Sequence, residues 1–213
     1  FSSPKWAGST FFLLASCAIV LATSVGVETQ GTDPIPSSSA GAKDADPAYQ
    51  GFGAKTPGGY AKAIVRVANL NDSGPGSFRD AVSQGNRTVV FDVAGEIVLT
   101  KTVYIRGAFI TVDGFTAPGA GITLKNYGLS ISGNRGAHDI IVRGIRVRDA
   151  GIKGDKEQSD GMNVVKGAYN VVIDHVSIHG SEDGNMDIGT DSRDVTVSWS
   201  IFAEPRATQK NML

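Results

Sequence analysis

A repeat of short apolar runs organises the second half of this 213-residue sequence. Equivalent runs begin at Phe109, Ile140, Val171 and Val195, at intervals of 31, 31 and 24 residues. Each repeat has a short strand-like stretch, a small turn with Gly, and then Asp or Asn before the longer apolar stretch. Repetition at periods of about 20 to 50 residues is typical of solenoids. The sequence therefore predicts a stack of coils, each covering the apolar face of its neighbour.

The repeated runs have the composition of β-strands. Val and Ile alternate with polar residues in stretches such as "AIVRVANL" and "YNVVIDHVSIHG", and 27 Gly residues supply turns. No long amphipathic helix separates them, which excludes helical and leucine-rich repeats and disfavours a doubly wound sheet. We predict an all-β chain that folds as a parallel β-helix. The alternative is an antiparallel sandwich, which does not require equal coil lengths or recurrent turn positions.

One short helix is expected before these coils. In "GSFRDAVSQG", Ser77 can cap the helix, Asp80 follows three residues later, and Gly85 can end it. We expect this helix to cap the N-terminal end of the strand array.

The N-terminal segment is predicted to direct export. Residues 1–27 place one Lys before an apolar run and then small residues, which is the order of a secretory signal. The alternatives are a buried N-terminal helix or a membrane anchor, although the run is shorter than the roughly 20 residues that a span needs. The stretch "LASC" also resembles a bacterial lipoprotein cleavage box at Cys17, although the apolar run continues past it.

Residues 28–50 are rich in Pro, Ser, Ala and Asp and contain almost nothing to bury. We expect a disordered linker there and a folded domain over residues 51–213. Because the final "RATQKNML" follows a strand-like run without a closing pattern, we expect that domain to be incomplete at its C-terminus.

Overall charge excludes some classes of partner. The chain has 20 basic and 21 acidic residues, so no general attraction to nucleic acid or to anionic lipid is implied. Cys17 is the only cysteine, and removal of a signal segment would leave none. A disulfide framework and a cysteine-based zinc site or nucleophile are therefore not expected in the mature chain.

An acidic stretch, "SEDGNMDIGTDS" at residues 181–192, is the clearest candidate site. In a parallel β-helix, equivalent positions of neighbouring coils lie about 4.8 Å apart, so Asp160 in one coil can meet Asp183 and Asp187 in the next. In a regular strand, Asp183 and Asp187 share one face. Carboxylates held together repel unless a cation or a proton separates them, and oxygen ligands on an open surface suit calcium. The alternative from spacing alone is a set of solubilising outward charges.

The order of several motifs resembles the pectate lyases of polysaccharide lyase family 1. The similarity runs from "GFGAKTPGG" through "NLNDSGPGSFRDAV", "RTVVFDVAGEIVL", "ITVDGFTAPGAGITL", "HDIIVRGIRVR" and "VVIDHVSIHGSEDGNMD" to "VTVSWSIFAEP", about three quarters of the chain. It implies a right-handed parallel β-helix, secretion to the extracellular space, calcium dependence, and β-elimination of polygalacturonate. The expected partner is an acidic plant-type polysaccharide, bound by a monomer without nucleic acid or, once the signal is removed, membrane.

The resemblance also assigns residues. It implies that Asp160, Asp183 and Asp187 bind Ca2+ and that Lys210, or alternatively Arg206, holds a substrate carboxylate. The arginine that removes the proton in the family lies on a later coil, beyond residue 213. We therefore expect the 213-residue chain by itself to have little or no lyase activity. Other possibilities are a pectin-directed glycoside hydrolase on the same scaffold, or a non-catalytic β-helix that binds polysaccharide.

Two other groups of polar residues are interpreted as structural. Asp174 and His175 are adjacent, and adjacent strand residues point to opposite faces, so we expect no direct dyad between them. A structural hydrogen bond is the favoured role of His175. Glu182 and Asp191 are expected to be solvated neighbours of the candidate cation site.

Overall fold

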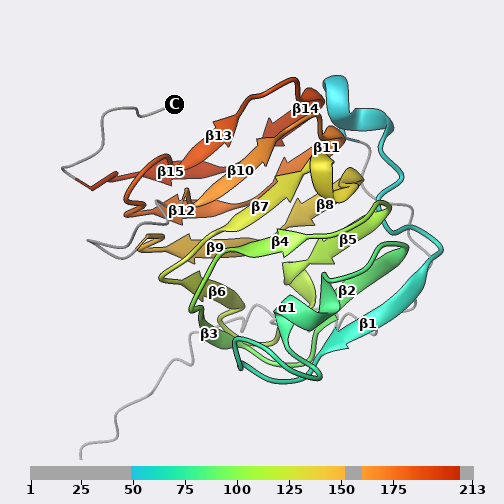
Figure 1. Ribbon diagram of the computed structural model, residues 1–213. Coiled ribbons are helices and arrows are strands. Elements are labelled where there is room, and N and C mark those ends of the chain that lie inside the picture. Colours follow the sequence, from blue (N-terminus) through green and yellow to red (C-terminus); the bar gives the residue numbers. More distant parts are fainter. Residues whose placement is uncertain (1–48, 152–159, 207–213) are drawn as a thin grey trace, which may run out of the picture. The chain divides into compact units, whose positions relative to one another are not determined.

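A computed structural model describes residues 49–151 and 160–206, and in this part of the chain all paired strands run parallel in three sheets (Figure 1). The six-stranded sheet has the order β1 (Ala63–Val67), β2 (Arg87–Phe91), β5 (Ile110–Asp113), β8 (His138–Arg143), β11 (Tyr169–Asp174) and β14 (Arg193–Ser198). The five-stranded sheet contains β3 (Gly95–Val98), β6 (Ile122–Lys125), β9 (Ile145–Arg148), β12 (Ser177–His179) and β15 (Ile201–Ala203). The four-stranded sheet contains β4 (Val103–Ile105), β7 (Leu129–Ser132), β10 (Met162–Val165) and β13 (Met186–Ile188).

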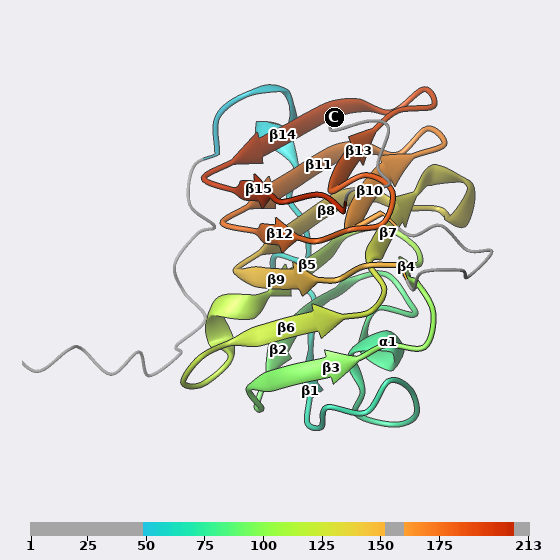
Figure 2. The ribbon, with the colours of Figure 1, turned by 90° about the vertical axis from the view of Figure 1, so that its left-hand side faces the viewer.

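Each coil contributes one strand to each of the three sheets in turn, and the coils stack one on the next (Figure 2). For example, β8, β9 and β10 form one coil, and β11, β12 and β13 form the coil beside it. This is the predicted parallel β-helix. The antiparallel sandwich is excluded for these strands, because every pairing recorded between them is parallel.

The repeat found in the sequence corresponds to the strand register, with one correction. Ile140 pairs with Val171 and Val171 pairs with Val195, as the intervals of 31 and 24 residues predicted. The partner of Ile140 in the preceding coil is Ile110, however, and not Phe109. The residue that precedes the paired run has a left-handed backbone in each of these coils, namely Phe109, Asp139, Asn170 and Asp194. Asp and Asn tolerate this conformation better than most residues, which explains their recurrence before the apolar run.

Inward-facing side chains form apolar rows along the stack. Val112 pairs with Val142, and Val142 pairs with Ile173, and none of the three is exposed. Burial of one such side chain contributes roughly 1.5 to 3 kcal/mol to folding. Repetition of these rows on three sheets gives a core that is continuous along the coils.

Helical structure in the described residues is short. Helix α1 (Phe78–Ala81) begins as predicted, because Ser77 accepts a hydrogen bond from the backbone N–H of Asp80, but it ends before Gly85. It lies beside β1 and β2 at one end of the stack, where Phe78 packs 5.7 Å from Phe91 between ring centroids (Figure 1). Three 3-10 helices complete the elements: η1 (Phe52–Lys55), η2 (Gly114–Thr116) and η3 (Gly133–Arg135).

Several sequence predictions fall outside the described residues. They include the secretory signal over 1–27 with Cys17, nearly all of the linker over 28–50, and Lys210. Among the helices of the described residues, none has the length and apolar character needed to cross a membrane.

Candidate functional site

Asp160 is held where two coils meet. It lies just before β10, and its Oδ2 accepts a 2.8 Å hydrogen bond from Asn163 Nδ2. Its Oδ1 accepts a 3.1 Å hydrogen bond from the backbone N–H of Gly184 in the next coil. The backbone N–H of Gly161 in turn donates to the carbonyl of Gly184 at 2.8 Å. These contacts fix the carboxylate of Asp160 against the turn that contains Asp183.

Asp187 approaches the same point from β13. Its direct partner across the sheet is Asn163, not Asp160. A Cβ placed on Gly184 would overlap Asp187 Oδ1 and would lie 3.2 Å from Asp160 Oδ1. Two carboxylates from different coils therefore converge on Gly184, and the absence of a side chain there leaves room for both.

Asp183 adds a third negative charge. Burial raises the pKa of Asp160, hydrogen bonds from Asn163 and Gly184 lower it, and the charge of Asp183 raises it, with a net rise. Burial, followed by the charges of Asp160 and Asp183, raises the pKa of Asp187. Within residues 49–151 and 160–206, no group of three His, Cys, Asp or Glu side chains is arranged closely enough to enclose a metal ion. The structure thus shows a repulsive acidic cluster with two converging carboxylates.

This repulsion has a consequence for stability that depends on pH. Because the pKa values of Asp160 and Asp187 are raised in the folded state, their contribution is fully present below about pH 3.8 and is lost as pH rises through the raised values. We expect that Asp187→Asn flattens this fall in unfolding free energy when a chelator is present. Urea unfolding between pH 3.5 and pH 7 measures the difference, and identical slopes for the two proteins would contradict it.

The strand through this site begins too late to include Asp183. A regular strand over 183–187 would turn Asp183, Asn185 and Asp187 outward, but β13 begins only at Met186. Asn185 is buried, accepts a hydrogen bond from the N–H of Ser181 and donates one to the carbonyl of Ala203. Asp183 therefore belongs to a turn that Asn185 holds in place, which alternation along a strand does not predict.

The Asp-Gly pairs in the sequence indicate a different alignment from the one in the structure. Asp-Gly occurs in both coils, as Asp160-Gly161 and as Asp183-Gly184, and suggests that the two aspartates are equivalent. The register instead pairs Met162 with Met186, which puts Asp160 beside Gly184. Asn163, Gly184 and Asn185, which the sequence reasoning did not select, position the cluster.

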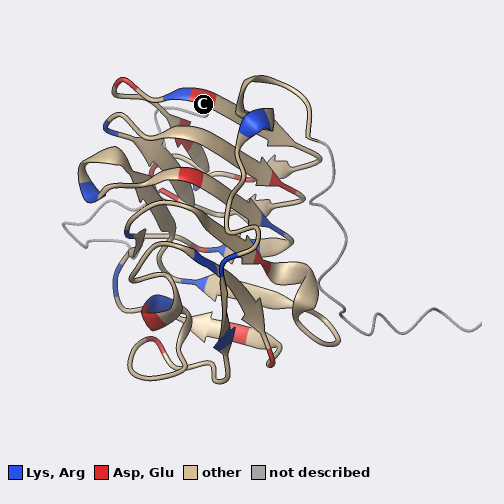
Figure 3. Cartoon of the chain, turned by 90° about the vertical axis from the view of Figure 1, so that its right-hand side faces the viewer, with Lys and Arg blue, Asp and Glu red and all other residues tan. Residues whose placement is uncertain are grey.

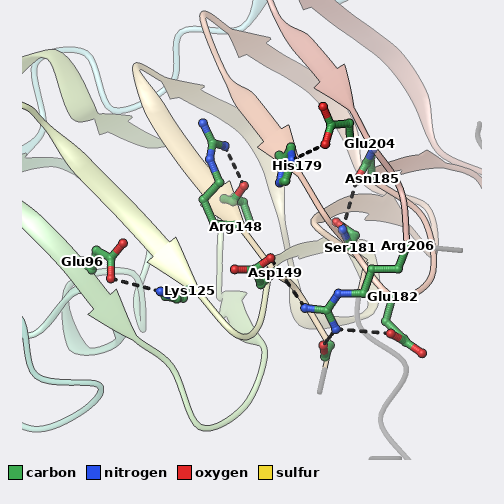
Figure 4. Close-up of polar contacts among 12 residues, drawn as sticks. Glu96, Lys125, Arg148, Asp149, His179, Ser181, Glu182, Asn185, Glu204 and Arg206 are labelled. Atoms are coloured by element: carbon green, nitrogen blue, oxygen red, sulfur yellow. Dashed lines mark hydrogen bonds and ion pairs between the residues drawn. The ribbon is translucent and has the colours of Figure 1, made fainter. Parts of the chain in front are cut away.

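Arg206 lies in a network of its own (Figure 4). Its guanidinium contacts Glu182 Oε2 at 3.2 Å, Asp149 Oδ1 at 3.8 Å and the carbonyl of Gly151 at 2.5 Å. Glu182 was expected to be solvated, but its side chain is only 18% exposed and contacts Arg206. Asp191 is exposed, as predicted. Since two carboxylates surround Arg206, its role as a substrate contact stays a prediction, as does that of Lys210.

Asp174 and His175 do contact each other, which corrects the expectation from strand alternation. Strand β11 ends at Asp174, and His175 has a left-handed backbone with φ of 50°. This bend brings His175 Nδ1 to 2.7 Å from Asp174 Oδ2, while Ser198 Oγ donates to Asp174 Oδ1. The imidazole also lies between the rings of Phe115 and Trp199. These contacts are consistent with the favoured structural role.

Two curated proteins are similar to this chain in sequence. No family model matches the chain. The chain is 43% identical over 158 residues to "Probable pectate lyase C" of Aspergillus oryzae, which covers 74% of this chain and 36% of that protein. It is 33% identical over 177 residues to "Probable pectate lyase 6" of Arabidopsis thaliana, with 72% and 37% covered. The chain thus spans little more than a third of the length of these relatives.

A solved structure supports the architecture. The crystal structure of Jun a 1, the major allergen from cedar pollen, superposes with a TM-score of 0.57 at 21% sequence identity, over 70% of this chain and 47% of that one. At this identity the likeness concerns the fold alone. The sequence similarity to the two enzymes named above is what shows that this chain is a homologue of pectate lyases, over the part of them that it matches.

Proposed function

We propose that this chain is part of a secreted, calcium-dependent pectate lyase that cleaves polygalacturonate by β-elimination. The observation that carries the proposal is the convergence of Asp160 and Asp187 on Gly184, with the charge of Asp183 acting on both. The relatives carry the name pectate lyase, and the acidic cluster supplies the oxygen ligands that calcium prefers.

The chemical type of the donors, oxygen atoms of carboxylates, suits a hard cation. Asp160, Asp183 and Asp187 would hold it, and neither His nor Cys accompanies them, which makes zinc a poor match. Bound calcium would supply a Lewis acid that stabilises the charge developing on a uronate carboxylate as the neighbouring proton is removed. Asn163 and the N–H of Gly184 orient Asp160 before any ligand arrives, which lowers the cost of assembling the site.

Three other parts of the proposal concern the whole protein. Residues 1–27 would direct export, residues 28–50 would link this segment to the β-helix, and the mature protein would act as an extracellular monomer. The base stays predicted on a coil beyond residue 213, with Lys210 or Arg206 as the contact to a substrate carboxylate.

The reaction class is tested with full-length protein and polygalacturonate. β-Elimination gives an unsaturated sugar, so we expect ultraviolet absorbance to rise with cleavage, to stop with a chelator, and to return with added calcium. New reducing ends without absorbance would show a hydrolase. Binding without cleavage would show a polysaccharide-binding β-helix, and cleavage unchanged by the chelator would remove the metal role of the three aspartates.

A further inference from the structure

The outer face of the four-stranded sheet links the acidic cluster to a second polar region. Strand register aligns Tyr104 with Ser130, Ser130 with Asn163, and Asn163 with Asp187. Ser130 Oγ donates a 2.7 Å hydrogen bond to Asn163 Oδ1 within this row. Three coil spacings separate the ends of the row, about 14 Å. Ser130 itself is buried, so the row sets the spacing between Asp187 and Tyr104 and is not itself a ligand surface.

A basic hollow lies beside Tyr104. It has a volume of about 220 Å³ and is lined by Arg79, Ser83, Lys101, Thr102, Tyr104 and Arg106. Three of these lining residues are cationic, and none is a carboxylate. Arg135 from the next coil stacks over the ring of Tyr104 at 4.1 Å, and its carbonyl accepts a hydrogen bond from the N–H of Gly107. Figure 3 shows that Lys and Arg also recur in loops of several coils.

The cations of this hollow have different roles. Arg79 is paired with Asp72 at 2.5 Å and donates to the carbonyls of Lys101 and Thr102, so it holds the loop before β4. Lys101 and Arg106 are exposed, and neither forms an ion pair with a carboxylate of the described residues. Their charges are therefore not neutralised by the part of the chain that the structure describes, and they face solvent beside a polar ring.

We propose that Lys101, Arg106 and Arg135, grouped around Tyr104, form a subsite that binds carboxylates of an acidic polysaccharide, several sugar units away from the aspartate cluster. A polyuronate carries one carboxylate on each sugar, so a chain long enough to span about 14 Å can present anions to these cations while another of its carboxylates lies at a cation held by Asp160 and Asp187. The identity of this polysaccharide rests on the proposed function, whereas its anionic character follows from the hollow itself. The Arg guanidinium groups suit carboxylates because they offer paired N–H donors.

The test uses the double variant Lys101→Gln with Arg106→Gln. Affinity for polygalacturonate is measured by retardation in native gels that contain the polysaccharide, with a chelator and with calcium. Exposed ion pairs are each worth roughly a two- to fivefold change, so we expect about tenfold weaker binding by the double variant under both conditions. Binding of highly methyl-esterified pectin, which has few carboxylates, should be the same for the two proteins.

Lys125→Gln is the matched control, because Lys125 lies on the five-stranded sheet 3.4 Å from Glu96 and away from the hollow. It should bind polygalacturonate as the parent protein does. Equal binding by the parent and the double variant in chelator would overturn the proposal, as would equal retardation of the parent by the sulfated polymer heparin, which would show a general anion patch. If the double variant loses binding but calcium never strengthens that of the parent, the subsite stands and the calcium function fails.

Discussion

Calcium is expected to stabilise this chain, and replacing Asp187 with Asn is expected to abolish that gain. A cation that binds only the folded state at about 100 times its Kd adds about 2.7 kcal/mol to the free energy of unfolding. We expect the parent protein to show a gain of this order and the variant to show almost none. In chelator we expect the opposite order of stability. Asp187→Asn should then have the larger free energy of unfolding, because the charges of Asp160 and Asp183 no longer act on a carboxylate at residue 187.

Urea unfolding with and without calcium measures both effects. Asp191→Asn is the matched control, since Asp191 is an exposed acid in the following turn with a left-handed backbone that Asn also tolerates. It removes the same charge from the same part of the chain and should leave the calcium gain intact. A variant at Asp187 that kept the gain, or that was destabilised in chelator, would show that the carboxylate is structural and not a cation ligand.

A methyl group at Gly128 is expected to destabilise the protein and to weaken calcium binding at the same time. Gly128 precedes β7, and a Cβ there would overlap the carbonyl oxygens of Asp160 and Gly161 in the next coil. Backbone cannot move aside as a flexible side chain does, so we expect Gly128→Ala to cost about 2 to 3 kcal/mol. Because the displaced residue is Asp160 itself, the calcium gain should shrink as well.

Gly189→Ala provides the comparison. Gly189 follows β13, a Cβ there meets no heavy atom within 4 Å, and the backbone is not left-handed. This variant should unfold at nearly the same urea concentration as the parent and keep the calcium gain. Equal stability of the two Gly variants would mean that the coils are less tightly spaced at Gly128 than the structure shows.

The stack of coils was predictable from the sequence because its cause is repeated in the sequence. Asp139, Asn170 and Asp194 each precede an apolar run and mark the same left-handed position in successive coils. The predicted start of the run at Phe109 is one residue too early. Phe109 has the left-handed backbone that Asp or Asn has in the neighbouring coils, but its apolar side chain makes it look like part of the run. Helix α1 was predicted from its cap, since Ser77 and Asp80 act locally.

Local rules failed where the chain leaves regular structure. The contact between Asp174 and His175 was rejected on the assumption that the strand continues, but it ends at Asp174 and the left-handed backbone of His175 brings the two side chains together. Similarly, the shared face of Asp183 and Asp187 is expected only for a regular strand, whereas β13 begins at Met186 and Asn185 turns inward and holds a bend. In both places a period of two does not hold beyond the end of a strand.

By itself the sequence determined the parallel coils, their approximate lengths and the two stretches that carry the acidic residues, because hydrophobic period and turn residues act over short distances. Only the tertiary structure decided that Asp160 lies beside Gly184 and that Asp187 pairs with Asn163. It also decided that Arg206 forms an ion pair with Glu182. Those relations depend on the register between coils. A shift of one residue in register changes which side chains meet, and the length of each loop between strands sets that register.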